Sequence, residues 1–155
     1  MQINYLSYFL ASILSYLGLL VGVILIKLAP EEQKPGKRYF VIIKKILFLL
    51  IIAFLLLFYN LNLMLAVMLL AFVIALVFSK KIDLKRTAMV YFFLGIVFYL
   101  SSKFISLFAI ESILIFLYSI PHASLMLGIR KRNYAHIFAK GLWFFVPIIV
   151  LYFVF

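Results

Sequence analysis

Long runs of hydrophobic residues follow one another along almost the whole chain, and short polar segments separate them. A helix needs about 20 such residues to cross the roughly 30 Å hydrocarbon core of a bilayer. The pattern therefore predicts six membrane-spanning helices, near residues 4–28, 39–59, 62–79, 87–102, 107–129 and 136–155. A membrane β-barrel requires alternating hydrophobic and polar residues, whereas the run 46–58 is hydrophobic throughout. We expect an all-α integral membrane protein built as a six-helix bundle.

Composition strengthens this prediction and limits the classes of function. Of the 155 residues, 69% are hydrophobic and 12% are charged, compared with about 25% charged residues in an average soluble domain. The connections between the predicted helices are too short for a separate catalytic or nucleotide-binding domain, so residues 1–155 are expected to form one membrane domain. The sequence lacks the HExxH, GxSxG, P-loop and dinucleotide-binding motifs. We expect no enzymatic activity, no metal site and no cofactor.

Basic residues mark alternate connections between the predicted helices. The first connection and its flanks hold six of the 15 lysines and arginines, and the third and fifth hold four each. The second connection has none, and the fourth has only Lys103. Basic residues accumulate in short cytoplasmic loops, so the three basic connections are expected to face the cytoplasm and both termini the outside. This topology describes three hairpins in the cell membrane, and whether they form an internal repeat stays open.

The net charge of +11 would suggest a nucleic-acid partner in a soluble protein. In a membrane protein the same residues fix the topology and attract anionic headgroups on the cytoplasmic side, at about 1 kcal/mol per basic residue near the surface. We therefore expect the lipid bilayer and its anionic headgroups as partners, and no nucleic acid.

Small residues recur along one face of the first predicted helix. Steps of four, four, three and four residues separate them, which keeps them on one helix face over about four turns. They are Ser7, Ala11, Ser15, Gly18 and Gly22. Small residues let helix backbones approach closely in a membrane. The stripe predicts a tight contact, either with another helix of the same chain or in a homo-oligomer seam or the wall of a translocation path.

The fifth predicted helix contains an acidic residue inside a hydrophobic run. Tyr118 and His122 follow Glu111 after seven and 11 residues and so return to nearly the same helix face. Ser119 lies beside this stripe. An ionisable residue within the membrane is costly unless it is paired or hydrated. The four residues are therefore candidates for a proton or cation path.

Structural explanations of the same residues stay open. Glu111 lies close to the outer end of its helix, where it could pair with Lys103. Pro121 frees the carbonyl of Leu117 by removing a backbone donor, and His122 could donate to that carbonyl. In both cases the polar residue would serve stability rather than transport.

The segment 29–38, between the first two predicted helices, mixes acidic and basic residues. Its charged residues are Glu31, Glu32, Lys34, Lys37 and Arg38. Pro35-Gly36 suits the centre of a type II turn, because proline fixes φ and glycine adopts a positive φ. The segment is a candidate for binding a cytoplasmic partner or lipid headgroups, and an ordinary solvated loop is the alternative.

Two functions of different class follow from these features. The first is an oligomeric transporter or channel for a small solute or ion, with the stripe of Glu111 lining the path. The second is a non-catalytic membrane subunit or scaffold that binds other membrane proteins. Glu111 and His122 favour the first, whereas the small size of the chain favours the second.

Overall fold

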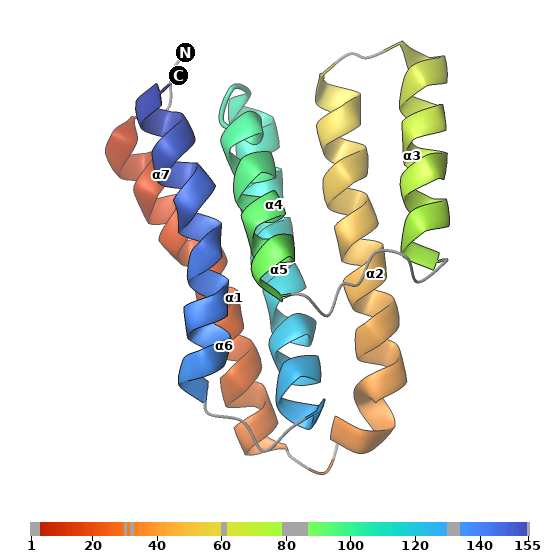
Figure 1. The fold of residues 1–155 in the computed structure, drawn as a ribbon, viewed down its shortest axis with the longest axis vertical. Coiled ribbons are helices and arrows are strands. Elements are labelled where there is room, and N and C mark those ends of the chain that lie inside the picture. The colour runs from red at the N-terminus through yellow and green to blue at the C-terminus, as the bar shows by residue number, and fades with distance from the viewer. Residues whose placement is uncertain are drawn as a thin grey trace.

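The computed structural model describes residues 4–29, 31, 33–59, 62–78, 87–129 and 134–154. The helices are α1 (Tyr5–Leu28), α2 (Gln33–Phe58), α3 (Leu63–Phe78), α4 (Thr87–Ser101), α5 (Ile105–Ile129), α6 (Tyr134–Gly141), the 3₁₀ helix η2 (Leu142–Phe144) and α7 (Phe145–Val154). The last three follow one another without a break and form a single rod (Figure 1). These segments contain no strand, so the prediction of an all-helical chain is confirmed for them.

Among the described residues, four helical segments are long and apolar enough to cross a membrane. They are Tyr5–Leu28, Pro35–Phe58, Ile105–Leu127 and Ile137–Val154. The helices at the third and fourth predicted spans are shorter than these four. Helix α3 has 16 residues and α4 has 15, which corresponds to roughly 24 and 22 Å of helix. Both lie in the half of the molecule that holds the two chain termini, and α3 ends and α4 begins near its middle (Figure 1).

The start of α2 differs from the sequence prediction. Pro35 and Gly36 lie inside the first turn of a helix that begins at Gln33, so the predicted type II turn is wrong. Proline is tolerated there because the backbone N–H groups of a first helical turn have no intrahelical partner to lose. The helix therefore starts six residues before the predicted start at residue 39.

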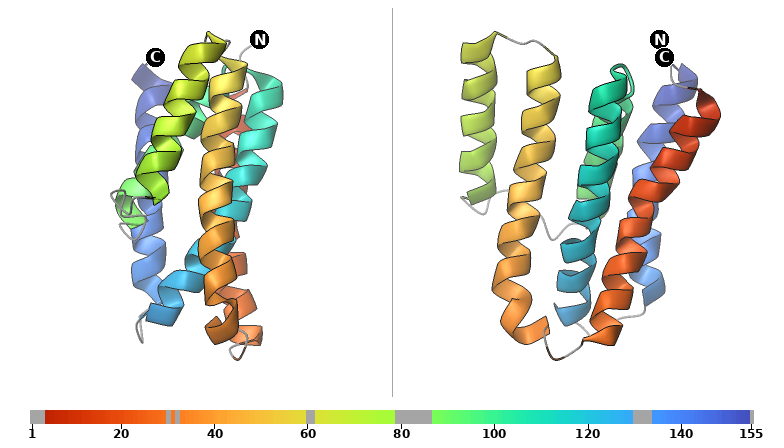
Figure 2. Two further views of the ribbon diagram at one scale, coloured as in Figure 1. Left: turned by 90° about the vertical axis from the view of Figure 1, so that its right-hand side faces the viewer. Right: turned by 180° about the vertical axis from the view of Figure 1, so that it is seen from behind.

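Helix α5 lies at the centre of the arrangement. It makes its most extensive contacts with α1 and then with α2, while α4 packs on α7 and η2 as well as on α5. Seen from behind, α3, α2, α5 and α1 stand in a row, with the α6–α7 rod beside α1 and α4 (Figure 2). Helix α3 packs mainly against α2 and closes one edge.

Aromatic side chains fill the core between α1, α4, α5 and η2. The ring of Phe98 lies 5.3 Å from that of Tyr8, 5.0 Å from that of Phe108 and 5.6 Å from that of Phe144, measured between centroids. The outer surface, in contrast, exposes large hydrophobic side chains on every long helix, among them Leu14 and Met68. Such extended apolar surface is unfavourable in water and suits a bilayer.

Candidate functional site

The closest helix contact joins α1 to α5 through glycine. A Cβ atom added to Gly18 would overlap the carbonyl oxygen of Phe116, and one added to Gly22 would lie 2.5 Å from the carbonyl oxygen of Ile120. The hydroxyl of Ser15 lies 3.0 Å from the carbonyl oxygen of Ser112 across the same contact. This contact, the α1–α5 seam, therefore forms between two helices of one chain.

The other two residues of the small-residue stripe lie differently. Ala11 is partly buried and packs against the hydrophobic core. Ser7 is exposed, so the structure does not place it in the α1–α5 seam. Because the seam already buries Gly18 and Gly22 against α5, these two glycines are not available to a second copy of the chain.

Unpartnered polar atoms gather on one face of α5. Glu111, Tyr118 and His122 are each 0% exposed. Both carboxyl oxygens of Glu111, the hydroxyl of Tyr118 and Nδ1 of His122 make no hydrogen bond, and in the described part of the chain no other buried side-chain nitrogen or oxygen shares this property. Buried polar groups are normally hydrogen-bonded. We refer to these three residues as the α5 stripe.

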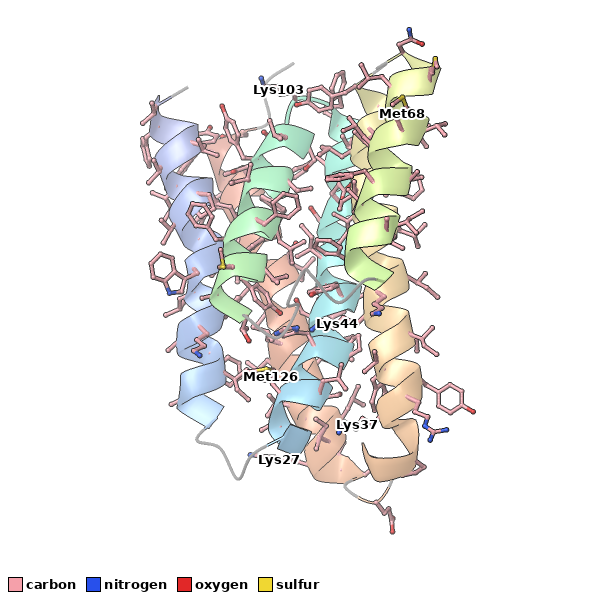
Figure 3. The ribbon with its side chains drawn as sticks, turned by 45° about the vertical axis from the view of Figure 1, so that its right-hand side comes forward. Lys27, Lys37, Lys44, Met68, Lys103 and Met126 are labelled. Carbon is pink, nitrogen blue, oxygen red and sulfur yellow. The ribbon has the colours of Figure 1, made fainter. Side chains whose placement is uncertain are left out.

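Glu111 is not neutralised by the partner that the sequence suggested. Lys103 is exposed at the end of the bundle, in the connection between α4 and α5 (Figure 3). The two residues form no ion pair, and the carboxyl oxygens lack any hydrogen-bond donor among the described residues. The Glu111–Lys103 pair, which the sequence left open as a structural alternative, is therefore not formed, because the carboxyl group is buried in the helix packing while the lysine stays at the surface.

His122 lies among side chains from α4 and α5. Its Nε2 atom is 3.4 Å from the hydroxyl oxygen of Thr87. Its ring makes an edge contact with Tyr91, at 5.4 Å between centroids, and stacks on Tyr118 at 5.7 Å. The hydrogen bond to the carbonyl of Leu117, which the sequence left open as an alternative, is not formed: Nδ1 has no hydrogen-bond partner, and Nε2 lies against Thr87.

The hydroxyl of Ser119 has hydrogen-bond partners on α4 and α5. It accepts a bond from the Tyr91 hydroxyl at 3.0 Å and lies 2.9 Å from the carbonyl oxygen of Ile115. It therefore links α4 to α5 and differs from the unpartnered groups of the α5 stripe.

Lys44 is a site residue that the sequence interpretation assigned to topology alone. It lies in α2 with 6% of its surface exposed, and its Nζ atom is 5.9 Å from the centroid of the Tyr118 ring. This is within the range of a cation–π contact. Figure 3 places Lys44 near the middle of the bundle, at the level where α4 begins. The sequence offers no signal that separates it from Lys45, which follows it in the same run.

The first connection shows no charge cluster among the residues that the structure describes. Glu31, Lys37 and Arg38 are exposed, and no ion pair joins them. Glu32 lies outside the described residues, and so does the side chain of Lys34. The exposed residues are accessible to lipid headgroups or to a partner.

Comparison of the chain with protein families, with curated proteins and with solved structures finds no match.

Proposed function

We propose that the chain is a multi-pass protein of the cell membrane, with six helices arranged as three hairpins. Four full-length apolar helices and the exposed hydrophobic surface support this proposal. Lys27 and Lys37 lie at one end of the bundle, and Lys103 lies at the other (Figure 3). Both termini lie at the same end of the bundle as Lys103. The positive-inside rule then puts both termini outside, with Lys37 and Arg38 facing anionic headgroups.

Within that membrane domain, the proposed function is transport of a small solute or ion along the α5 stripe. The observation that carries it is that the four unpartnered buried side-chain atoms of the described residues all belong to Glu111, Tyr118 and His122. Inside a membrane protein, a buried polar atom without a hydrogen-bond partner lowers the stability of the fold. Ionisable residues inside a membrane mark proton relays and substrate paths. A path that brings a proton, cation or solute to these atoms accounts for their retention.

Flux through reconstituted vesicles tests this function. Glu111→Gln keeps the shape and hydrogen-bonding capacity of the side chain but deletes its charge, so we expect it to abolish or uncouple proton or cation flux while the protein stays folded. Glu31→Gln is the matched control, because Glu31 is exposed outside the helix packing, and it should leave flux unchanged. Equal flux in wild type and Glu111→Gln would refute transport along the α5 stripe.

The alternative is a scaffold or non-catalytic subunit that binds another membrane protein. The observation that favours it is α3, which packs mainly on α2 and exposes much of its hydrophobic surface. Purification in mild detergent separates the two functions: a stoichiometric membrane-protein partner favours the scaffold, whereas a homo-oligomer that supports flux favours the transporter.

A further inference from the structure

The carboxyl group of Glu111 is enclosed by helix packing. The side chain is 0% exposed, and neither carboxyl oxygen has a hydrogen-bond partner. A carboxylate charge is costly in such surroundings unless something compensates it. A proton removes the charge by binding to the carboxyl group itself, and it requires no ligand from any other residue. A metal cation, in contrast, requires further ligands beside the carboxyl group.

Side chains do not supply those further ligands. Ca²⁺ and Mg²⁺ take about six or more oxygen ligands at roughly 2.0–2.6 Å, so neighbouring ligands of one cation lie about 3 Å apart. A hydroxyl group that shared a cation with Glu111 would therefore lie within hydrogen-bonding distance of its carboxyl oxygens, and none does. Among the described residues, no three histidine, cysteine, aspartate or glutamate side chains come together as metal ligands.

The backbone around Glu111 does not supply ligands either. Backbone carbonyls coordinate Na⁺ inside membrane proteins where a helix is unwound. Helix α5 is continuous from Ile105 to Ile129, and its proline, Pro121, lies ten residues beyond Glu111. The carbonyls next to Glu111 therefore belong to an uninterrupted helix. The geometry favours a proton over a metal cation at this position.

The other two residues of the α5 stripe also carry groups that exchange protons. The hydroxyl of Thr87 donates to Sδ of Met126 at 3.4 Å. Nε2 of His122, 3.4 Å from the same hydroxyl, is then the nitrogen that carries the ring proton, and Nδ1 is an acceptor without a donor. The unpartnered hydroxyl of Tyr118 can donate and accept. Acidic and histidine side chains form the proton relays of membrane pumps and transporters.

We propose, on the basis of the proposed transport, that the ion carried by the α5 stripe is the proton and that Glu111 binds it. Loading forms one O–H bond on the carboxylate. Release breaks that bond and leaves the electron pair on the carboxylate oxygen, so no metal ion or other co-reactant takes part. A proton also enters an enclosed carboxyl group without displacing the side chains packed around it.

Flux assays in reconstituted vesicles distinguish the cargo. A pH-sensitive dye inside the vesicles reports protons, and radioactive tracers report Na⁺ and K⁺, each under an imposed gradient of that ion. We expect proton flux above that of protein-free vesicles and no uptake of either tracer. Glu111→Gln should abolish the proton flux. Glu31→Gln, at an exposed position, is the matched control and should leave it unchanged.

The outcomes separate the proton as cargo from transport in general. Uptake of Na⁺ or K⁺ that is lost in Glu111→Gln, without proton flux, would overturn the proton as cargo and keep transport along the α5 stripe. Equal flux in wild type and Glu111→Gln would refute both, and so would the absence of flux for all three ions.

A spectroscopic measurement tests the same site without flux and without changing Glu111. The chain has three glutamates, Glu31, Glu32 and Glu111, so the double variant Glu31→Gln/Glu32→Gln retains Glu111 alone. With ¹³C in the glutamate carboxyl group, the carbon chemical shift of this variant in lipid bilayers at neutral pH distinguishes a carboxylic acid from a carboxylate. We expect the carboxylic acid. A carboxylate would show that a counterion compensates Glu111 in place of a proton and would overturn the proposal.

Discussion

The buried carboxyl group of Glu111 is difficult to explain by the stability of the fold. Its two carboxyl oxygens are buried without a donor among the described residues, so the side chain contributes no hydrogen bond to the fold. A buried polar group of this kind usually lowers stability. The position is therefore better explained by a proton, cation or donor group that arrives along the α5 stripe than by a structural need of the bundle.

This argument predicts an opposite effect on stability and on flux. Glu111→Met, which has a similar length and no polar oxygen, should raise the free energy of unfolding by about 1–3 kcal/mol, the usual cost of an unsatisfied buried group, while flux is lost. Thermal or denaturant unfolding in detergent measures the first effect. Glu31→Met, at an exposed position, should change stability little. A large loss of stability in Glu111→Met would show that the carboxyl group has a structural partner.

The residues of the α5 stripe could be predicted from the sequence, because a polar residue inside a hydrophobic run is conspicuous and helical spacing fixes its face. Lys44 could not be predicted in the same way. It precedes Lys45 in a segment that ends a basic connection, and a hydropathy argument treats both as boundary residues. Only the position of α2 relative to α5 distinguishes Lys44, which is buried, from its neighbour, which is partly exposed.

At the scale of the helix pair, the α1–α5 seam depends on the absence of side chains at two positions. The atoms that a new Cβ would meet at Gly18 and Gly22 are backbone carbonyl oxygens of α5. Backbone atoms cannot rotate away as a flexible side chain can. The two helices must separate to accept even one methyl group. Their separation would also break the contact between Ser15 and the carbonyl oxygen of Ser112.

Alanine substitutions test this seam against a matched glycine. Alanine favours a helix over glycine by about 1 kcal/mol, so any loss of stability reports packing. Gly18→Ala and Gly22→Ala should each cost about 1–3 kcal/mol net, as overpacking does. Gly36→Ala, in the first turn of α2, should be neutral or stabilising, because the nearest atoms there belong to the movable ring of Phe40. Similar Tm values for all three variants in detergent would contradict the packing argument.

The sequence predicts this seam and misses another. Four-residue steps mark Gly18 and Gly22, whereas Gly95 of α4 has no small residue three or four positions away. Gly95 nevertheless lies so close to the rod formed by α6, η2 and α7 that an added Cβ atom would overlap the carbonyl oxygen of Phe144. The predicted spans 62–79 and 87–102 agree with α3 and α4 to within one residue at each end, but hydropathy does not show how deep either helix reaches into the bundle.

At the scale of the whole molecule, the distribution of basic residues predicts a direction across the membrane. The chain termini and Lys103 share one end, and Lys27 and Lys37 lie at the opposite end. In the proposed topology Glu111, in the second turn of α5, lies nearer the outside than Tyr118 and His122 do.

This orientation can be tested with introduced cysteines, because the chain contains none of its own. Lys37→Cys and Lys103→Cys both replace exposed residues, at opposite ends of the bundle. In intact cells a membrane-impermeant thiol reagent should label Lys103→Cys and leave Lys37→Cys unmodified, and permeabilised cells should show labelling of both. Losing one lysine from the basic end does not invert the expected orientation, since basic residues remain there in excess. The reverse labelling pattern would place the termini in the cytoplasm and Glu111 at the inner side, and labelling of both residues in intact cells would show that the two ends are not separated by the membrane.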